Sequence, residues 1–286
     1  MSVSPTLASN DVTGLSGKVV VVSGAARGQG RSHALRFAAL GARVIAFDVC
    51  AQIEGVPFPM STPEDLDQTV ALGRAAGGII EGWQADVRHT DQVEGVIRRA
   101  VAGFGGVHVL VASAAILSER APFWETSEDD FRRVLDVNLL GTWRMVKAAA
   151  PELIKTRGSV VVTGSGASVK GLPNIGAYVT SKHALVGMVR VLAREFAPLG
   201  VRVNAVLPGN VNTPMFNNEA MRRLHVPAEP DPTQEQFLAV ARKNVPMGIP
   251  YVEPSDVTEA VVWLASVAAR HVTGVLLPVD AGSAIP

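Results

Sequence analysis

The stretch Gly24-Ala25-Ala26-Arg27-Gly28-Gln29-Gly30 decides the fold, because of what lies on either side of it. A continuous β-branched run at 18–22 precedes it and predicts a buried strand, and a helical pattern follows at 32–40. Gly41 is a natural helix stop, and a second buried strand is expected at 43–47. Strand, glycine-rich turn, helix and strand together predict one βαβ unit.

The same alternation continues along the chain. Further strands are expected at 107–112, 158–163, 201–206 and 275–279, and helices at 91–102, 128–156, 177–197 and 255–265. Short apolar strands that alternate with helices predict an α/β protein, a single-domain Rossmann fold whose doubly wound parallel sheet carries helices on both faces. We expect this domain to span residues 17–286 and to follow a flexible tail at 1–16.

Two stretches depart from this rhythm. Residues 49–78 form an added Pro-rich segment directly after the second strand, and Thr62-Pro63 opens a short helix within it. Residues 208–254 form a long connection that contains three of the Met residues. Long connections in compact domains are usually functional, so the first is expected near a cofactor and the second as a substrate lid.

The composition excludes several classes of protein. Of 286 residues, 48% are hydrophobic and 18% charged, with 26 basic and 26 acidic side chains, which argues against disorder and against a broad nucleic-acid footprint. No run is apolar enough to span a membrane, and the first 16 residues do not resemble a signal peptide. Cys50 is the only cysteine and the six His are scattered, so neither a disulfide nor a metal site is expected. A soluble, cytoplasmic protein fits best.

The glycine-rich turn predicts a dinucleotide site. Its glycines let the backbone approach a pyrophosphate, and the helix after Gly30 offers free N–H groups. Asp48 closes the second strand, where a carboxylate can accept both ribose hydroxyls of NAD and repel the 2′-phosphate of NADP. Arg27 favours NADP instead, since its guanidinium could hold that phosphate. Asp48 weighs more, because an unpaired carboxylate beside the phosphate costs more than Arg27 returns, so NAD is predicted.

Tyr178 and Lys182 begin a helical run and share one face of it. A phenol has a pKa of ~10, and we expect the nearby ammonium to lower that pKa and make the phenolate a usable base. Ser165 lies just past a predicted strand, where its hydroxyl could bind a substrate oxygen. A solvated helix face would explain the Tyr–Lys pair alone, but not its combination with a nucleotide turn.

Over residues 17–283 the chain resembles the short-chain dehydrogenase/reductases. The matching residues are Gly24, Gly28, Gly30, Asp86, Val87, Asn138, Ser165, Tyr178, Lys182, Pro208 and Gly209. The resemblance implies that Tyr178 is the acid/base, that Lys182 lowers its pKa and holds the nicotinamide ribose, and that Ser165 polarises the substrate oxygen. It also implies that Asn138 supports this relay through a kinked helix and water.

The resemblance extends to the cofactor contacts. It implies that Asp86 and Val87 meet the adenine, and that Val211 and Thr213 meet the nicotinamide carboxamide. Where the family has Asn-Asn-Ala-Gly after the fourth strand, this chain has Ala112-Ser113-Ala114-Ala115. Ser113 and Ala114 are still expected at the cofactor, and Ser113 can still hydrogen-bond. The family's glycine is replaced by Ala115, so the sequence does not predict the backbone conformation at this position.

One branch of the family is especially similar at 28–33 and 48–52, the mycofactocin-associated, carveol dehydrogenase-like branch. It implies NAD held under the added segment and reoxidised by mycofactocin. The apolar helices at 128–156 and 177–197 exceed what one sheet must cover, so a homo-oligomer is expected, a homotetramer as in similar proteins. Met and Phe side chains in the lid favour an apolar cyclic or terpenoid secondary alcohol as substrate. Packing of the lid itself would explain Met215, Met221 and Phe237 equally well. The alternatives are an ordinary, freely exchanging NAD(P) dehydrogenase of another substrate class and a non-catalytic dinucleotide sensor.

Overall fold

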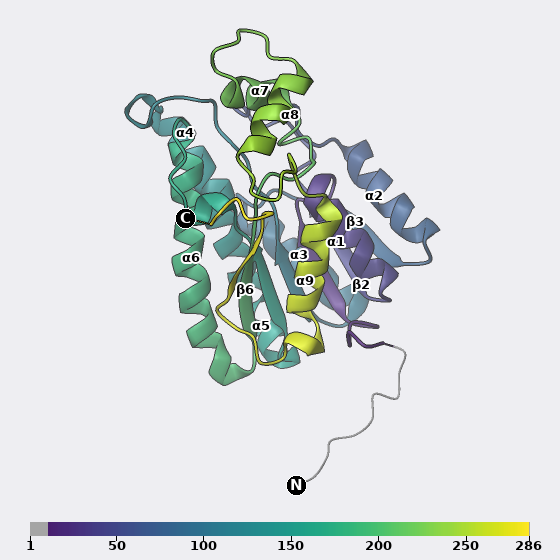
Figure 1. Ribbon diagram of the computed structural model, residues 1–286. Coiled ribbons are helices and arrows are strands. Elements are labelled where there is room, and N and C mark those ends of the chain that lie inside the picture. Colours follow the sequence, from purple (N-terminus) through teal and green to yellow (C-terminus); the bar gives the residue numbers. More distant parts are fainter. Residues whose placement is uncertain (1–10, 286) are drawn as a thin grey trace.

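The computed structural model describes residues 11–285 and is built on a seven-stranded, wholly parallel sheet (Figure 1). The strand order is β3-β2-β1-β4-β5-β6-β7. The strands are β1 Val19–Ser23, β2 Arg43–Asp48, β3 Ile79–Gln84, β4 Val109–Ala112, β5 Ser159–Thr163, β6 Arg202–Pro208 and β7 Leu276–Val279. The order reverses between β1 and β4, and open α/β sheets bind ligands at the carboxyl ends of the strands beside such a point.

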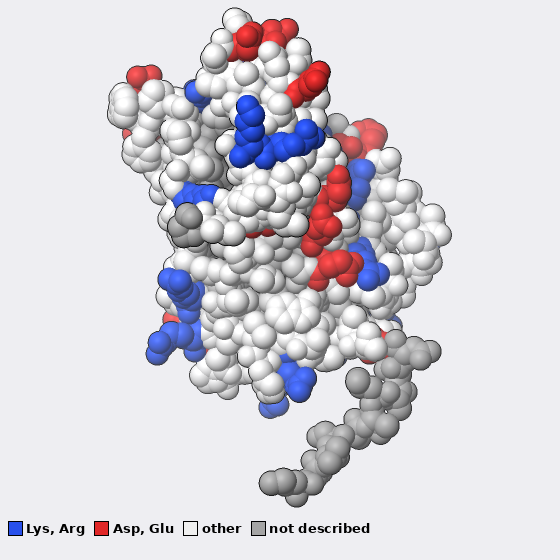
Figure 2. Space-filling view, in the orientation of Figure 1, with Lys and Arg blue, Asp and Glu red and all other residues white. Residues whose placement is uncertain are grey.

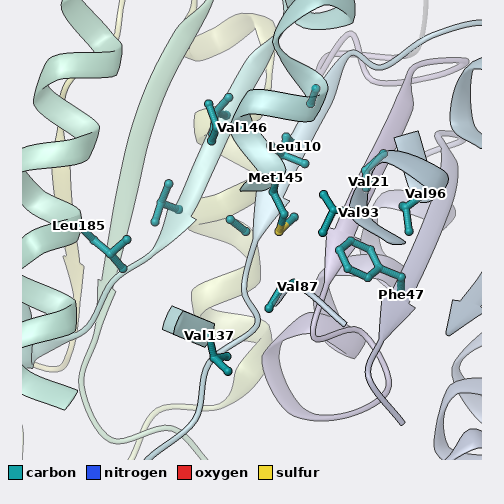
Figure 3. Close-up of a cluster of buried hydrophobic side chains, with 14 of the residues drawn as sticks. Val21, Phe47, Val87, Val93, Val96, Leu110, Val137, Met145, Val146 and Leu185 are labelled. Carbon is teal, nitrogen blue, oxygen red and sulfur yellow. The ribbon is translucent and has the colours of Figure 1, made fainter. Parts of the chain in front are cut away.

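Helices cover both faces of the sheet, which confirms the predicted doubly wound fold. One face carries α1 Gly28–Ala39, α2 Pro63–Ala75 and α9 Pro254–Ala265, and the other carries α3 Thr90–Phe104, α5 Thr142–Thr156 and α6 Gly176–Phe196. Along β1, Val19 and Val21 pack into one buried cluster while Val20 and Val22 pack into the other. A strand buried on both faces reads as a continuous apolar run, which is why the sequence revealed it. Figure 3 shows the cluster that contains Val21.

The predicted single helix at 128–156 is wrong in one respect. The structure divides it into α4 Glu128–Leu135 and α5, with a π-helical turn at Asp136–Gly141 between them. A π turn bulges because its hydrogen bonds skip one residue further along the chain. Gly141 lies within this turn, where an added Cβ would come 2.7 Å from Val87 Cγ2. The turn therefore packs closely against the loop after β3.

Strand β3 is absent from the sequence prediction. It lies at the edge of the sheet, most of its side chains are exposed or half-buried, and Gly82 interrupts its apolar pattern. An edge strand half covered by helices lacks the apolar run that identified the others.

The predicted tail at 1–16 is too long. Residues 1–10 lie outside the described part of the chain, but residues 11–16 form a turn on the body of the protein. The Asp11 carboxylate accepts hydrogen bonds from the backbone N–H groups of Thr13, Gly14 and Ser16, and Leu15 is buried. The folded domain therefore includes residues 11–16.

The long connection after β6 contains two helices, α7 Glu219–His225 and α8 Gln234–Lys243. They rise above the carboxyl end of the sheet in Figure 1. Among residues 11–285, no helix has both the length and the apolar character that crossing a bilayer requires.

Candidate functional site

A cleft of about 160 Å³ lies at the carboxyl ends of the strands. It collects most of the residues predicted for the cofactor and the chemistry: Gly24, Arg27, Gly28, Gln29, Gly30, Asp48, Asp86, Val87, Ser113, Ala114, Tyr178, Lys182 and Thr213. The remaining predicted residues, Asn138, Ser165, Pro208, Gly209 and Val211, lie outside its lining. Val211 is buried and forms a β-bridge with Val252 at the base of the lid.

The glycine-rich turn needs its glycines for close packing. A Cβ on Gly30 would lie 2.1 Å from the Gly24 carbonyl oxygen, and Gly24 itself has a φ of +65° beside the backbone of Ala114. Helix α1 begins here with no acidic residue in its first turn and, within the described chain, no side-chain cap. Its first N–H groups and positive dipole end are thus available to an anion such as a pyrophosphate.

Two buried polar atoms at the cleft support this interpretation. Gln29 Oε1 and Thr163 Oγ1 have no hydrogen-bond partner among residues 11–285, and both residues line the cleft. Buried polar atoms are nearly always satisfied, so unpaired ones in a cleft indicate a polar ligand. The cleft therefore fits a dinucleotide with a polar group at each of these positions.

Asp48 is held in place by both of its oxygens. Oδ2 accepts the Ala26 N–H at 3.0 Å, and Oδ1 accepts the Ser61 hydroxyl at 2.7 Å. A carboxylate offers about four acceptor positions, so two remain for ribose hydroxyls.

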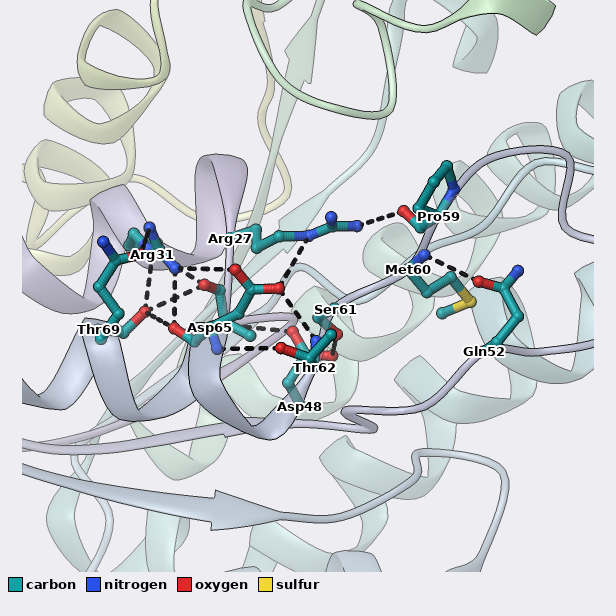
Figure 4. Close-up of polar contacts among 12 residues, drawn as sticks. Arg27, Arg31, Asp48, Gln52, Pro59, Met60, Ser61, Thr62, Asp65 and Thr69 are labelled. Carbon is teal, nitrogen blue, oxygen red and sulfur yellow. Dashed lines mark hydrogen bonds and ion pairs between the residues drawn. The ribbon is translucent and has the colours of Figure 1, made fainter.

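Arg27 does not stand free for a 2′-phosphate. Its Nη2 donates to the Pro59 carbonyl at 2.7 Å, and its Nε lies 3.9 Å from Asp65 Oδ2 (Figure 4). Both partners belong to the added segment. Arg27 therefore joins the glycine-rich turn to that segment, which removes the main sequence argument for NADP.

The added segment itself supplies cleft residues that sequence reasoning missed: Val49, Ile53, Phe58, Met60 and Ser61. The segment is organised around the Gln52 amide, whose Oε1 accepts the Met60 N–H at 3.0 Å and whose Nε2 donates to the Val56 carbonyl at 3.2 Å. Its position directly after Asp48 was the only signal in the sequence. The added segment is therefore part of the cleft wall.

The departure from the family pattern after β4 leaves the backbone regular. The Ser23 hydroxyl accepts the N–H groups of both Ser113 and Ala114 at 3.0 Å, which ties the ends of β1 and β4 together. Among the described residues, the non-glycine positions with positive φ are Cys50, Arg157, Asn174 and Ala281. Ala115 has an ordinary backbone conformation that any residue can adopt, so replacement of the family's glycine introduces no backbone strain.

Asp86 has a partner that the sequence did not suggest. Its carboxylate forms a bidentate pair with the Arg88 guanidinium, with the closest atoms 2.6 Å apart. Burial raises the pKa of Asp86, but the hydrogen bonds and charge of Arg88 outweigh burial and hold that pKa below its usual value. With its carboxylate bound to Arg88, Asp86 can offer an adenine only the acceptor positions that Arg88 leaves free.

Tyr178 and Lys182 lie on one face of α6, as predicted, with Lys182 Nζ 5.6 Å from the centre of the Tyr178 ring. Burial works against the predicted effect of Lys182 on the phenol. Burial raises the pKa of Tyr178, and its hydrogen bond with Ser165 only partly offsets that rise. Burial also lowers the pKa of Lys182 to about 7, so its ammonium is only partly populated near neutral pH. Lys182 Nζ donates to the Thr163 carbonyl at 2.8 Å.

Asn138 is buried in the π turn and does not face solvent. Its Oδ1 accepts the Ile116 N–H at 2.8 Å, and its Nδ2 donates to Ser181 Oγ at 3.0 Å. The Ser181 hydroxyl in turn donates to the Tyr178 carbonyl at 2.7 Å. The Asn138 side chain thus connects the loop after β4 to the helical turn that carries Tyr178.

The lid is held together by aromatic rings. Phe216 and Phe237 lie 4.8 Å apart, and the rings of His225 and Tyr251 pack edge-on against Phe216. Phe237 is therefore a packing residue within the lid. Met215, by contrast, lines the cleft.

Other candidate groups are structural. Cys50 is buried, and burial raises the pKa of its thiol to about 12, so it is a packing residue as predicted. Within the described chain, the His183 ring bonds only the Val179 carbonyl of its own helix. Between residues 11 and 285, no three His, Cys, Asp or Glu side chains are grouped so that they could hold a metal ion.

The chain is similar to known dehydrogenases and reductases. Residues 24–284 match the family described as enoyl-(acyl carrier protein) reductase. The (−)-trans-carveol dehydrogenase of Rhodococcus erythropolis is 39% identical over 275 residues, which cover 94% of this chain and 98% of that protein.

Solved structures agree. The carveol dehydrogenase of Mycobacterium avium in complex with NAD has a TM-score of 0.93 and 39% identity, covering 96% of this chain and all of the other. A short-chain dehydrogenase of Mycobacterium paratuberculosis bound to NAD has a TM-score of 0.85 and 37% identity, with coverage of 94% and 98%. The chain belongs to the short-chain dehydrogenase/reductase family.

Proposed function

We propose that the protein oxidises an apolar cyclic or terpenoid secondary alcohol to its ketone, or catalyses the reverse reaction, with Tyr178 as the acid/base. The single observation that carries this proposal is that one cleft is lined by Tyr178, Lys182 and the glycine-rich turn, while Ser165 hydrogen-bonds Tyr178. That arrangement combines a dinucleotide site with a proton donor and acceptor.

The predictions of an NAD cofactor and of an NAD-dependent alcohol dehydrogenase are confirmed by the related proteins above. In this chain the turn at 24–30 would hold the pyrophosphate, and Asp48 the adenosine ribose. Lys182 would hold the nicotinamide ribose. Bound NAD would supply the hydride acceptor and, when oxidised, a positive charge near Tyr178.

The raised pKa of Tyr178 makes the phenol a proton donor in the state described here. In ketone reduction, its O–H gives a proton to the developing alkoxide, and Ser165 donates a hydrogen bond to the same oxygen. In alcohol oxidation, the phenol oxygen must first lose its proton. Positive charge at Lys182 and at oxidised NAD would then lower the pKa of Tyr178.

The substrate class rests on apolar residues that line the same cleft as Tyr178. They include Ile116, Pro214 and Met215, which offer an apolar surface with one adaptable thioether. Two of the related proteins are carveol dehydrogenases, and carveol is a cyclic terpenoid alcohol.

We further propose that NAD stays bound between turnovers and is reoxidised in place by a carrier such as mycofactocin. The contact of Arg27 with Pro59, together with that of Ser61 with Asp48, fixes the added segment beside the adenosine end of the cleft. A segment fixed in this way would have to detach from both residues before the nucleotide could leave.

Mass spectrometry of nucleotide released by denaturing the purified, extensively dialysed protein tests retention. Stoichiometric NAD supports it, and alcohols are then screened with an artificial electron acceptor. An empty protein that binds added NAD reversibly favours the alternative of an ordinary exchanging dehydrogenase. A protein that binds NAD and turns over no alcohol or ketone in a broad screen favours the dinucleotide sensor.

We also propose a homotetramer. Leu140, Trp143 and Val191 expose more than two fifths of their surface on α5, α6 and the adjoining π turn, although these helices also carry buried faces. Exposed apolar helix faces of this kind are typical of subunit contacts. Light scattering during size-exclusion chromatography gives the mass that decides the question.

A further inference from the structure

A second hollow, of about 310 Å³, lies at the opposite end of the sheet from the cofactor cleft. It opens between the amino ends of β1, β4, β5 and β6 and the end of α9. Five basic side chains from separate segments line it: Lys18, His108, Arg157, Arg202 and Arg270. Its described lining contains neither Asp nor Glu.

Carboxylates elsewhere in the described chain do not neutralise this cluster. No ion pair within 4.0 Å joins Lys18, Arg157, Arg202 or Arg270 to an acidic group of residues 11–285. Asp11 lies seven residues before Lys18, but its carboxylate oxygens accept hydrogen bonds from Thr13 and Ser16 in the turn at 13–16. Residues 1–10 contain no Asp or Glu at all. In Figure 2, the lower end of the molecule carries mainly blue side chains, and most of the red ones on this face lie beside α9 and on the lid.

Two of the five basic groups have structural roles. The Arg202 guanidinium donates to the carbonyls of Leu264, Ala265 and Ser266, and so caps the end of α9. His108 accepts the Val19 N–H through Nδ1 at 3.1 Å. In the neutral ring the proton is then on Nε2, which is left as a donor. These contacts hold both residues in fixed positions in the wall of the hollow.

The other three, Lys18, Arg157 and Arg270, are exposed, and their side chains make no hydrogen bond within the described chain. Arg157 is the most informative, because it has a φ of +49° after the end of α5, a position that favours glycine or asparagine. Its stem lies against Gly200, where an added Cβ would come 3.1 Å from Arg157 Cγ. Arg157 thus lines the hollow with a constrained backbone and a stem that packs against Gly200.

We propose that this hollow binds a phosphate group, either inorganic phosphate or a phosphate monoester. A phosphate dianion neutralises two of the unpaired cations, and the planar forks of Arg157 and Arg270 match its oxygens in pairs. The helix dipole accounts for a cation at the end of α9, which is Arg202, but does not require the other three. This site is separate from the cofactor cleft and independent of the proposed reaction.

Calorimetric titration of the NAD-saturated protein tests the proposal, because bound NAD occupies the phosphate site of the glycine-rich turn. Inorganic phosphate and glycerol 3-phosphate are titrated separately, in chloride buffers of matched ionic strength. Saturable binding of both supports a site for the phosphate group itself. Binding of the ester alone supports a site that also contacts the organic part.

The variant Arg157→Gly combined with Arg270→Ala is expected to weaken binding at least about tenfold, the loss that removal of one charge-assisted contact implies. Glycine keeps the left-handed turn, so this variant should fold. Lys18→Ala provides an independent second variant, and Arg190→Ala, an exposed arginine on α6, is the control that should leave binding unchanged. Absence of saturable binding, or equal binding by the Arg157/Arg270 variant and the wild type, overturns the proposal.

Discussion

The added segment at 49–78 and the lid at 208–254 both contribute to the same cleft, yet they are held in different ways. The segment is fixed by directional polar contacts: Arg27 to Pro59, Ser61 to Asp48, and Gln52 to Met60. Each of these bonds holds for only a narrow range of donor and acceptor positions.

The lid is held mainly by its own aromatic cluster around Phe216 and Phe237. Its polar contacts outside the lid include one from Arg120 Nη1 to the Arg223 carbonyl, at 3.1 Å on the surface. Apolar packing is not directional and tolerates shifts of the whole unit. The contrast suggests that the segment is built to keep one arrangement around a resident cofactor, and that the lid is built to move as substrates come and go.

Tyr178 lines the cleft to which both regions contribute, and removal of its hydroxyl should have the largest effect. Tyr178→Phe deletes the hydroxyl that gives and takes the proton, so turnover should fall by about 10²- to 10⁴-fold. Retained NAD should not change, because the ring and its packing remain. Steady-state kinetics and nucleotide mass spectrometry on the same preparation measure both. Turnover within a few-fold of wild type would show that another group moves the proton.

Truncation within the lid should affect only the substrate side. Phe237 is fully buried, and Phe237→Ala should destabilise the lid by about 3–5 kcal/mol through lost contacts and a cavity. We expect the KM for an apolar alcohol to rise tenfold or more, with unchanged NAD retention. Phe237→Leu, which keeps most of the volume, should recover most of the loss. If Phe237→Ala released NAD instead, the two regions would not be independent.

Removal of the Arg27–Pro59 contact should have a smaller effect, and it should change the release of NAD and leave the KM of the alcohol unchanged. Arg27→Met removes the bond to Pro59 and should speed NAD release about tenfold, which corresponds to about 1.4 kcal/mol, while the KM of the alcohol stays the same. Nucleotide remaining after timed dialysis measures the rate. Arg36→Met is the matched control, because Arg36 lies on α1, the helix that follows Arg27, and pairs with Glu259. Equal release from both variants would show that Arg27 does not hold the segment in place.

The sequence alone revealed the parts of this protein that depend on local patterns. Buried strands such as β1 are runs of β-branched residues, and the turn at 24–30 is marked by glycines, two of which adopt a positive φ. What it could not reveal depends on contacts between distant residues. Arg27 donates to the Pro59 carbonyl across 32 residues of sequence, and Asn138 lies within the π turn while its side chain bonds the Ile116 backbone. Neither partner is marked by any pattern.

The electrostatics of the site were missed for the same reason. Spacing places Tyr178 beside Lys182, but it does not tell how deeply either is buried. In the folded protein, burial raises the pKa of Tyr178 and lowers the pKa of Lys182 to about 7. Both shifts arise because burial disfavours the charged form of each group. The sequence therefore identified the chemical groups and not their protonation.

The lowered pKa of Lys182 predicts a modest dependence of stability on pH. Between about pH 7 and the ordinary lysine pKa, the unfolded chain holds a proton on Lys182 that the folded protein does not, so folding stability should rise with pH. One proton corresponds to a slope of about 1.4 kcal/mol per pH unit. Denaturant titrations between pH 7 and 8.5 measure it.

This window isolates Lys182 from the other shifted groups. The lowered pKa values of His33, His108 and His225 act below pH 6.5, and the raised pKa of Cys50 acts above about pH 9. Lys182→Met keeps the apolar stem and removes the titration, so it should flatten the slope. A slope of the same size in that variant would mean that Lys182 is solvated enough to keep its proton, and that its charge is already present to act on Tyr178 at neutral pH.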